Sequence, residues 1–376
     1  KTYHRLKGVQ EMIADVKKVT VSYNDRIVGY LAQLDEKTIG FQYDDEWLKN
    51  GFSISPLSLP LRKEIFVSKS KHFDGLYGVF WDSLPDGWGE LLVKRFLAKQ
   101  GVNYDRLSPL TKLSLIGENG LGGFSYQPSQ YEDGNRGLLD FDTLAREVEK
   151  ILNDENADDL DAVYRLGGSS GGARPKAHVR IDGEEWIVKF PCRIDPKNVG
   201  ELEYKANVTA RECGISVNEF FLFPSNLCSG YFGVKRFDRS DGKRIHMISL
   251  AAVLETTHRV PNLDYGYLLR VIERICGDKD DMYEAFRRMC FNVYYGNKDD
   301  HSKNFAFLYD GKRGSYRLSP AYDLTRTPDK LEHEMTVNRS GNPTDADMLA
   351  LAEDFKLNMH KCRTIMNNVK VHCLKK

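Results

Sequence analysis

A polar loop that runs straight into an apolar hairpin constrains this chain more than any other feature. The loop reads Gly296-Asn297-Lys298-Asp299-Asp300-His301-Ser302-Lys303-Asn304. Residues 304–309 then predict a strand, and an Asp-Gly turn leads to a returning antiparallel strand at 315–318. Folding about residues 311–312 places Asn304 opposite Ser319 and carries Asp323 back to the Asn304 end. The sequence therefore predicts two oxygen-bearing side chains brought together by one hairpin.

The spacing inside this loop indicates a chemistry. Asp299 and Asn304 lie five positions apart, which is the spacing of the catalytic Asp and the metal-binding Asn in the catalytic loop of protein kinases. We therefore predict Asp299 as the catalytic carboxylate and place His301 in the nucleotide site. Two alternatives stay open. The pattern D-x-H-x-x-N also resembles the loop of lipid kinases, and polar residues of this kind populate ordinary turns.

Asp323 and Asn304 form a predicted magnesium site. Carboxylate and amide oxygens suit Mg²⁺, and ATP phosphates and water would complete its coordination. Asp323 would act as the metal-binding Asp of kinases, although no D-F-G triplet is present. The alternative for Asp323 is a turn residue that caps the following segment.

Lys189 and Glu203 form a predicted ion pair. Lys189 lies in the apolar run Trp186-Ile187-Val188-Lys189-Phe190, and Glu203 shares a helix face with Val199, Ala206 and Ala210. A buried carboxylate needs a partner, and a strand lysine paired with a helix glutamate orients the amine toward nucleotide phosphates. The alternatives are an edge lysine that extends to water and a different basic partner for Glu203.

Two further segments are candidate nucleotide contacts. A glycine-rich loop at 167–176 precedes the Lys189 hairpin, and its backbone N–H groups are suited to phosphates. A flexible connector is the alternative. At the end of the β-rich part, backbone groups are candidates for adenine and Asp238 for ribose, although a plain strand end fits equally well. The predicted cofactor-binding residues in these segments are Ser169, Ser170, Gly171, Gly172, Ala173, Arg174, Lys176, Lys235, Phe237 and Asp238.

The order of elements predicts an α+β chain with a protein-kinase-like two-lobed fold. Residues 19–43 indicate β-hairpins, and helices are expected at 80–99, 141–152 and 199–213. The turn-rich stretch 127–136 is the best linker. We predict an N-terminal subdomain at 1–135, a β-rich lobe with the ATP loop at 136–240 and a mainly α-helical lobe at 241–376.

Composition excludes several other classes. Lys plus Arg equals Asp plus Glu, 54 each, so direct nucleic-acid binding is not favoured. Seven scattered cysteines without a C-x-x-C pair argue against disulfides and zinc and suit a cytoplasmic location. We find no H-E-x-x-H or G-x-S-x-G motif, no signal peptide and no apolar run of about 18 residues.

Taken together, the segments resemble the HipA-like serine/threonine protein kinases, the toxin components of bacterial type II toxin–antitoxin systems. The resemblance spans nearly the whole chain. It rests on SSGGARPKA at 169–177, IVKFP at 187–191, ELEYKA at 201–206, VKRFDR at 234–239, DDHSKNFAF at 299–307, LSPAYDL at 318–324 and, in the N-terminal part, VSYNDRIVGYL at 21–31, SLPL at 58–61 and FWDSLPDGWGELLVKR at 80–95.

The resemblance implies ATP and Mg²⁺ as cofactors and autophosphorylation of the ATP loop at Ser169 or Ser170, which silences the enzyme. It also implies a separate helix-turn-helix antitoxin, HipB-like, through which nucleic acid is bound only indirectly. A protein substrate is expected, such as a translation component, and no membrane association. The alternative from another class is a catalytically weak kinase-fold corepressor that acts through its DNA-binding partner.

Overall fold

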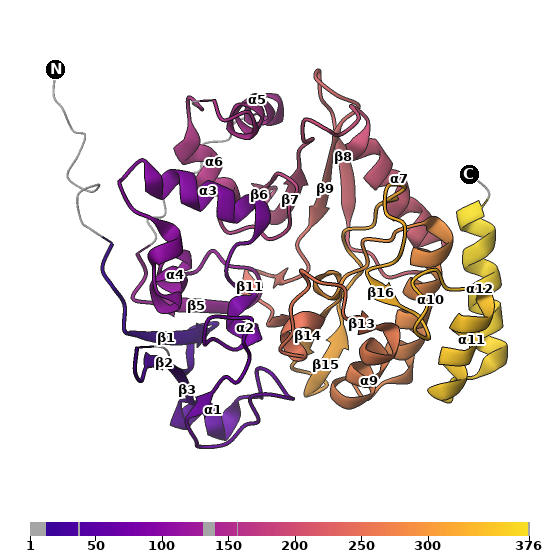
Figure 1. Cartoon of the computed structure of the whole chain (residues 1–376), viewed down its shortest axis with the longest axis horizontal. Helices are drawn as coiled ribbons and strands as arrows, with labels where there is room; N and C mark the ends of the chain where they lie inside the picture. The colour runs from indigo at the N-terminus through magenta and orange to yellow at the C-terminus, as the bar shows by residue number, and fades with distance from the viewer. Residues whose placement is uncertain (1–12, 37, 131–139, 156, 375–376) are drawn as a thin grey trace.

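The computed structural model describes residues 13–36, 38–130, 140–155 and 157–374. Figure 1 shows the early part of the chain (indigo to purple) on one side and the C-terminal helices (yellow) on the other, with the middle of the chain between them. The predicted linker at 127–136 and the predicted boundary at 135 fall in or next to residues 131–139, which lie outside the described residues.

The N-terminal region, residues 18–127, is built on a five-stranded antiparallel sheet in the order β4-β3-β2-β1-β5. The hairpins predicted at 19–43 are confirmed as β1 to β3. The elements of this region are β1 Lys18–Tyr23, β2 Arg26–Gln33, β3 Ile39–Tyr43, α1 Asp45–Asn50, β4 Phe66–Val67, α2 Gly78–Trp81, α3 Gly87–Ala98, the 3-10 helix η1 Tyr104–Arg106, α4 Pro109–Ile116 and β5 Phe124–Gln127.

The single helix predicted at 80–99 is wrong at its start, because the segment forms two helices, α2 and α3. Pro85 disfavours a helical conformation for the residue before it. Asp86 is extended, and Gly87 has a positive φ of 47°. The break places Asp86 at the beginning of α3, where its side chain bonds to Gly172 and Lys303.

The middle of the chain forms a second lobe around a four-stranded antiparallel sheet in the order β6-β7-β9-β8. The predicted helix at 141–152 is confirmed as α5, and the helix predicted at 199–213 is confirmed to within one residue. The elements are α5 Phe141–Leu152, α6 Leu160–Gly167, β6 Lys176–Ile181, β7 Glu184–Lys189, α7 Val199–Glu212, β8 Phe220–Phe223, β9 Tyr231–Lys235 and the short pair β10 Arg239–Ser240 and β11 Lys243–Arg244.

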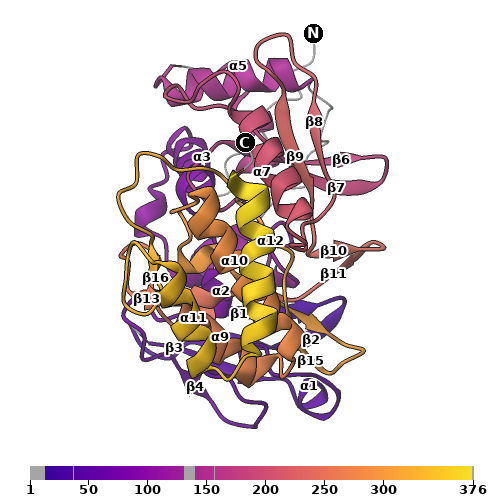
Figure 2. The same ribbon diagram turned by 90° about the vertical axis from the view of Figure 1, so that its right-hand side faces the viewer.

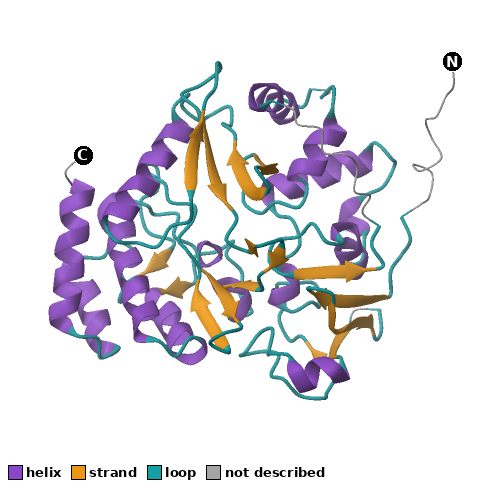
Figure 3. Cartoon of the chain, turned by 180° about the vertical axis from the view of Figure 1, so that it is seen from behind, coloured by secondary structure: helices purple, strands orange, loops and turns teal. Residues whose placement is uncertain are grey.

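The last part of the chain is mainly helical, as predicted, and Figure 2 shows α9, α10, α11 and α12 gathered on one side of the molecule. Figure 3 shows the small sheets lying between these helices and the N-terminal sheet. The elements are β12 Met247–Ser249, α8 Leu250–Val253, β13 Leu263–Asp264, α9 Tyr265–Ile275, α10 Lys279–Tyr295, η2 Ser302–Asn304, β14 Ala306–Asp310, β15 Ser315–Leu318, β16 Met335–Thr336, α11 Asp345–Asp354 and α12 Met359–Leu374.

The predicted hairpin between β14 and β15 is present, but its predicted register is wrong by two residues. Phe307 pairs with Leu318, and the Ser319 N–H donates to the Ala306 carbonyl at 2.8 Å. The turn is longer than expected, because Asp310 accepts the Gly314 N–H and Gly314 takes a positive φ of 65°. Asn304 consequently lies in η2, before the strand, rather than opposite Ser319.

Two large hydrophobic cores hold these parts together. One core joins the N-terminal sheet to the C-terminal helices, and the other packs α3 residues Trp88 and Leu92 against α5, α6 and the four-stranded sheet. The N-terminal region therefore contacts both lobes. The fold is a two-lobed kinase-like fold with an additional N-terminal part, as predicted. The boundary predicted at 240 falls at the end of β10 and stays a prediction.

Candidate active site

The predicted ion pair between Lys189 and Glu203 is present. Lys189 ends β7, Glu203 lies on the buried face of α7, and the Lys189 ammonium bonds to the carboxylates of both Glu203 and Asp323. The Lys189 side chain is only 11% exposed, which excludes an edge lysine extended into water. Three segments that are distant in sequence therefore meet at one amine.

Electrostatics favour the charged forms of Lys189 and Asp323, whereas burial raises the pKa of Glu203. Burial alone would lower the pKa of Lys189, but the adjacent Asp323 and Glu203 carboxylates outweigh it and raise the pKa. Burial likewise opposes the ionised form of Asp323, yet the Lys189 and Lys176 ammonium groups hold its pKa well below the usual range. Asp323 is therefore a carboxylate at neutral pH, as a metal ligand must be.

The backbone of Asp323 is in the left-handed region, with φ of 53°. A non-glycine residue there is strained, and such residues concentrate at functional sites. Its neighbour Tyr322 donates from its hydroxyl to the Lys303 carbonyl at 2.5 Å. This bond joins the residue before Asp323 to the residue before Asn304, so the two predicted metal ligands lie on adjoining segments, as the hairpin argument required.

The predicted catalytic loop follows α10 and ends in η2. Asn304 donates from its side-chain amide to the Asp299 carbonyl at 2.7 Å, which closes the loop between the two predicted residues. The Asp299 side chain is 42% exposed, so its carboxylate is open to an incoming hydroxyl group. It accepts from the Lys330 ammonium at 2.5 Å.

Asp300 and Lys330 are parts of this site that the sequence did not identify. Asp300 is buried and accepts from the Tyr265 hydroxyl at 2.7 Å and from the Glu334 N–H at 3.0 Å. These bonds hold Asp300 inside the protein, so Asp299 is the member of the pair whose carboxylate is exposed. The Asp-Asp pair was visible in the sequence, but which member is buried was not. Lys330 carried no local signal.

The glycine-rich loop, residues 168–175, connects α6 to β6. Ser170 is fully buried and donates from its hydroxyl to the Gly167 carbonyl at 2.5 Å, whereas Ser169 is half-buried. Lys176 donates to the Gly171 carbonyl at 2.6 Å. Lys176 also pairs across the strands with Lys189, which places the two lysines on one face of the sheet. The loop is therefore bonded to one amine, and a second amine lies on the same face of the sheet, an arrangement suited to phosphate binding.

Three other predicted nucleotide-binding residues bond to side chains of the protein itself. Arg174 bonds to Asp195 at 2.6 Å, and Lys235 pairs with Glu184 at 3.0 Å. Asp238 is buried and accepts from Arg236 and Arg239 and from the Gly122 N–H. A ribose hydroxyl would have to compete with these donors for the Asp238 carboxylate.

Phe237 and His301 each contact an aromatic ring. The Phe237 ring packs against Tyr322 with ring centroids 5.5 Å apart. His301 accepts the Lys303 N–H at 3.2 Å through Nδ1, which caps η2, and its ring lies 5.1 Å from that of His258. Burial, together with Lys303 and His301, lowers the pKa of His258 to about 4, so this neighbour is neutral at physiological pH.

The residues present fit Mg²⁺ bound with a nucleotide better than Mg²⁺ alone. Asp323 would contribute a carboxylate and Asn304 its amide oxygen, since the Asn304 amide nitrogen is the atom that donates to the Asp299 carbonyl. Within the described ranges, no group of three or more His, Cys, Asp or Glu side chains is arranged to hold a metal ion. Two protein ligands leave positions for phosphate oxygens and water, as in kinase sites.

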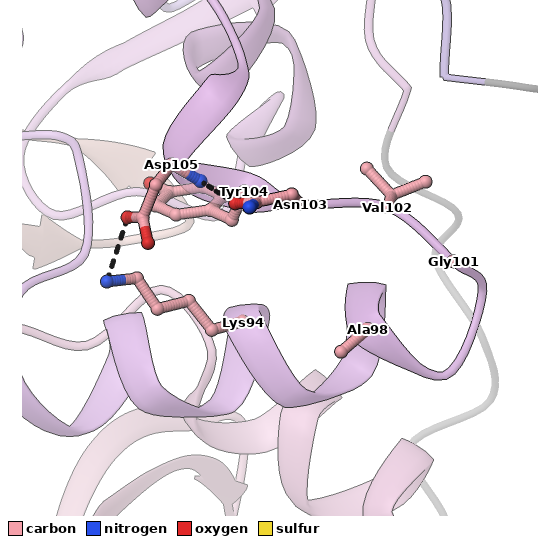
Figure 4. Close-up of a pocket in the computed structure, with 7 residues that line it drawn as sticks. All are labelled: Lys94, Ala98, Gly101, Val102, Asn103, Tyr104 and Asp105. Carbon is pink, nitrogen blue, oxygen red and sulfur yellow. Dashed lines mark hydrogen bonds and ion pairs between the residues drawn. The ribbon is translucent and has the colours of Figure 1, made fainter.

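An open hollow of about 420 Å³ lies elsewhere, between the C-terminal half of α3 and η1 (Figure 4). Lys94 reaches across it to Asp105 at 2.9 Å. Its lining residues, which also include Val102 and Tyr104, are not among the predicted site residues. The hollow is therefore separate from the constellation around Lys189.

Comparisons with protein families support the resemblance seen in the sequence. The model of the HipA-like C-terminal domain matches residues 168–376, and the model of the HipA N-terminal domain matches residues 19–127. Together the two matches include every site residue discussed above.

Two curated relatives come from Sinorhizobium fredii. "Putative kinase Y4dM" is 32% identical over 188 residues, covering 46% of this chain and 44% of that protein. "Putative kinase Y4mE" is 27% identical over 348 residues, covering 83% of this chain and 78% of that protein. The chain thus aligns with less than half of the length of the first relative and with more than three quarters of the second.

A solved structure shares the fold. It is HipA in the complex of the Shewanella oneidensis HipA, HipB and operator DNA, with a TM-score of 0.71, 17% identity, and coverage of 94% of this chain and 88% of that chain. Because the identity is only 17%, this match shows a shared fold and no shared function. No helix in the described ranges is long and apolar enough to cross a membrane.

Proposed function

Because the chain belongs to the HipA-like kinase family, we propose that it is an ATP- and Mg²⁺-dependent serine/threonine protein kinase. The observation that carries the proposal is the convergence of Glu203 and Asp323 on the buried Lys189 amine, beside the loop that bears Asp299 and Asn304. These are the parts that phosphoryl transfer requires of a protein.

Each residue has a distinct role in the proposed reaction. Lys189, oriented by Glu203, binds nucleotide phosphates, while Asp323 and Asn304 hold the metal. Bound Mg²⁺ would neutralise charge on the phosphates. Asp299 accepts the proton of the attacking hydroxyl group, and its exposure leaves room for a protein substrate.

Ser169 is the better candidate for autophosphorylation. Ser170 is fully buried, and its hydroxyl is already committed to the Gly167 carbonyl. Ser169 is half-buried at the beginning of the same loop. A phosphate there would add negative charge where the nucleotide phosphates bind, which would oppose ATP binding.

We further propose that the protein acts in the cytoplasm on a cellular protein and is controlled by a separate HipB-like, helix-turn-helix antitoxin. The solved structure with the same fold contains HipB and operator DNA, which supports the partner. The balanced charge of this chain agrees with indirect rather than direct DNA binding.

Intact-mass spectrometry after incubation with Mg-ATP tests the activity. Phosphatase-treated wild type should gain one phosphate, located on Ser169, with time. Asp299→Asn should gain none, because the hydroxyl loses its proton acceptor, and Ser169→Ala should gain none at this site. Ser170→Ala serves as the matched control and should still be phosphorylated at Ser169.

No gain in the wild type, together with no shift in melting temperature on adding Mg-ATP, would contradict the proposed kinase activity. The corepressor alternative would then be the better account. Phosphate on Ser170 rather than Ser169 would contradict only the choice of serine.

A further inference from the structure

Asp86 begins α3 but does not cap it. Aspartate at this position ordinarily accepts a hydrogen bond from a backbone N–H in the first turn of its own helix. Asp86 is extended, with φ of −130° and ψ of 171°, and makes no such side-chain bond. In contrast, Asp140, at the same position of α5, accepts the Thr143 N–H at 2.9 Å. The carboxylate of Asp86 is therefore used elsewhere.

Both oxygens of Asp86 contact the candidate active site. Oδ1 accepts the N–H of Gly172 in the glycine-rich loop, and Oδ2 accepts from the Lys303 ammonium at 2.5 Å in the catalytic loop. The side chains of Lys303 and Asp86 are 17% and 16% exposed. Burial alone would raise the pKa of Asp86, but the Lys303 charge and these two bonds outweigh it and lower the pKa. One carboxylate from the N-terminal region thus joins the glycine-rich loop to the loop that bears Asp299 and Asn304.

The residues after Asp86 lie directly against the glycine-rich loop. The Trp88 N–H donates to the Gly172 carbonyl at 2.9 Å, and the Trp88 indole donates to the Lys176 carbonyl at 3.1 Å. A Cβ on Gly87 would come within 2.5 Å of the Gly172 carbonyl oxygen, and one on Gly89 within 2.2 Å of that of Ser170. Glycine permits this close approach of two backbones.

We propose that Asp86 is a positioning residue, which holds the glycine-rich loop closed and fixes the side chain of Lys303, the residue before Asn304. The N-terminal region would then control how well the nucleotide site is ordered, although it supplies no predicted nucleotide ligand. The inference rests on the proposed function, because it concerns the order of the same site. With Asp86 in place, the ordering of residues 168–175 is completed before the nucleotide binds, which favours affinity.

Hydrogen–deuterium exchange of the full chain without nucleotide, followed by calorimetric titration with Mg-ATP, tests this. The variants are Asp86→Asn, which removes the charge, and Asp86→Ser, which retains the ability to cap α3. For each, exchange in residues 168–175 should rise, and the Kd for Mg-ATP should increase, both by about tenfold, because a charge-assisted hydrogen bond is lost. Exchange within α3 should stay as in the wild type.

Asp140→Asn is the matched control, since that aspartate caps its own helix and touches neither loop; it should change neither measurement. Unchanged exchange in 168–175 in both Asp86 variants would overturn the proposal. So would increased exchange throughout α3, which would show that Asp86 only stabilises its helix, and so would an unaltered Kd. If the wild type does not bind Mg-ATP, that result counts against the proposed function alone. The exchange measurement would still test the role of Asp86.

Discussion

At the scale of single residues, Lys189 is the position on which the site depends most. One buried ammonium group bonds to two carboxylates that come from α7 and from the segment after β15. Removing one member of a buried ionic cluster leaves the other charges without compensation, which costs far more than the loss of a surface pair. A substitution that removes the Lys189 ammonium group should therefore reduce both the stability of the protein and its nucleotide binding.

Lys189→Met should lower the free energy of unfolding by about 3–5 kcal/mol and abolish Mg-ATP binding. Urea denaturation and calorimetric titration measure the two effects. Lys205→Met, which removes an exposed partner of Glu201 on the same helix, should cost less than about 1 kcal/mol. Equal losses in the two variants would show that the Lys189 cluster contributes no more than a surface pair.

At the scale of elements, α2 is held by a carboxylate from another part of the chain. Glu255, after α8, accepts the Gly78 N–H at 3.1 Å and the Ser58 hydroxyl at 3.2 Å. Burial raises the pKa of Glu255 to about 7, although these two bonds oppose the shift. The folded state therefore binds a proton more tightly at Glu255 than the unfolded state does. Its contribution to stability is lost as the pH rises from about 4.5 through 7.

Glu255→Gln should therefore gain stability relative to the wild type as the pH rises, because glutamine resembles the neutral carboxyl group at every pH. The difference in urea midpoint, variant minus wild type, should be more positive at pH 8 than at pH 5. Glu353→Gln, on the exposed surface of α11, is the control and should show no such trend. A difference for Glu255→Gln that does not vary with pH would contradict the burial argument.

At the scale of the whole molecule, a buried ionic cluster joins the N-terminal region to the second lobe. Asp238 bonds to Arg236, to Arg239 and to the Gly122 N–H, while the two arginines donate to the Gly120 carbonyl. Together with the core shared between the N-terminal sheet and the C-terminal helices, this explains how three parts of the chain form one structure.

Asp238→Ala should destabilise the protein by about 3–5 kcal/mol, because two buried guanidinium groups lose their hydrogen-bonded carboxylate and keep only the more distant Glu185, 3.4 and 3.6 Å away. Urea denaturation followed by circular dichroism measures the loss. Asp161→Ala, at the exposed start of α6, should change stability by less than about 1 kcal/mol. A similarly small loss for Asp238→Ala would exclude a role for the cluster in joining the two parts.

Much of the fold and part of the site were predictable because their signals are local. The Asp-Gly hairpin of β6 and β7, the helix α5 and the spacing of Asp299 and Asn304 all depend on residues close in sequence. The pairing of Lys189 with Glu203 followed from strand and helix periodicity, because a buried carboxylate needs a partner. The β14–β15 register was wrong because turn length depends on the hydrogen bonds made by Asp310 and Gly314.

The sequence by itself determined most of the strands and helices and the position of the loop that bears Asp299 and Asn304, since propensity, periodicity and spacing act over a few residues. Only the tertiary structure decided that Asp86 bonds to Lys303 across 217 positions, that Lys330 meets Asp299, and that the Asp238 carboxylate faces arginines. These contacts exist because two cores pack distant segments together, and no local pattern specifies which polar side chains then come within hydrogen-bond distance.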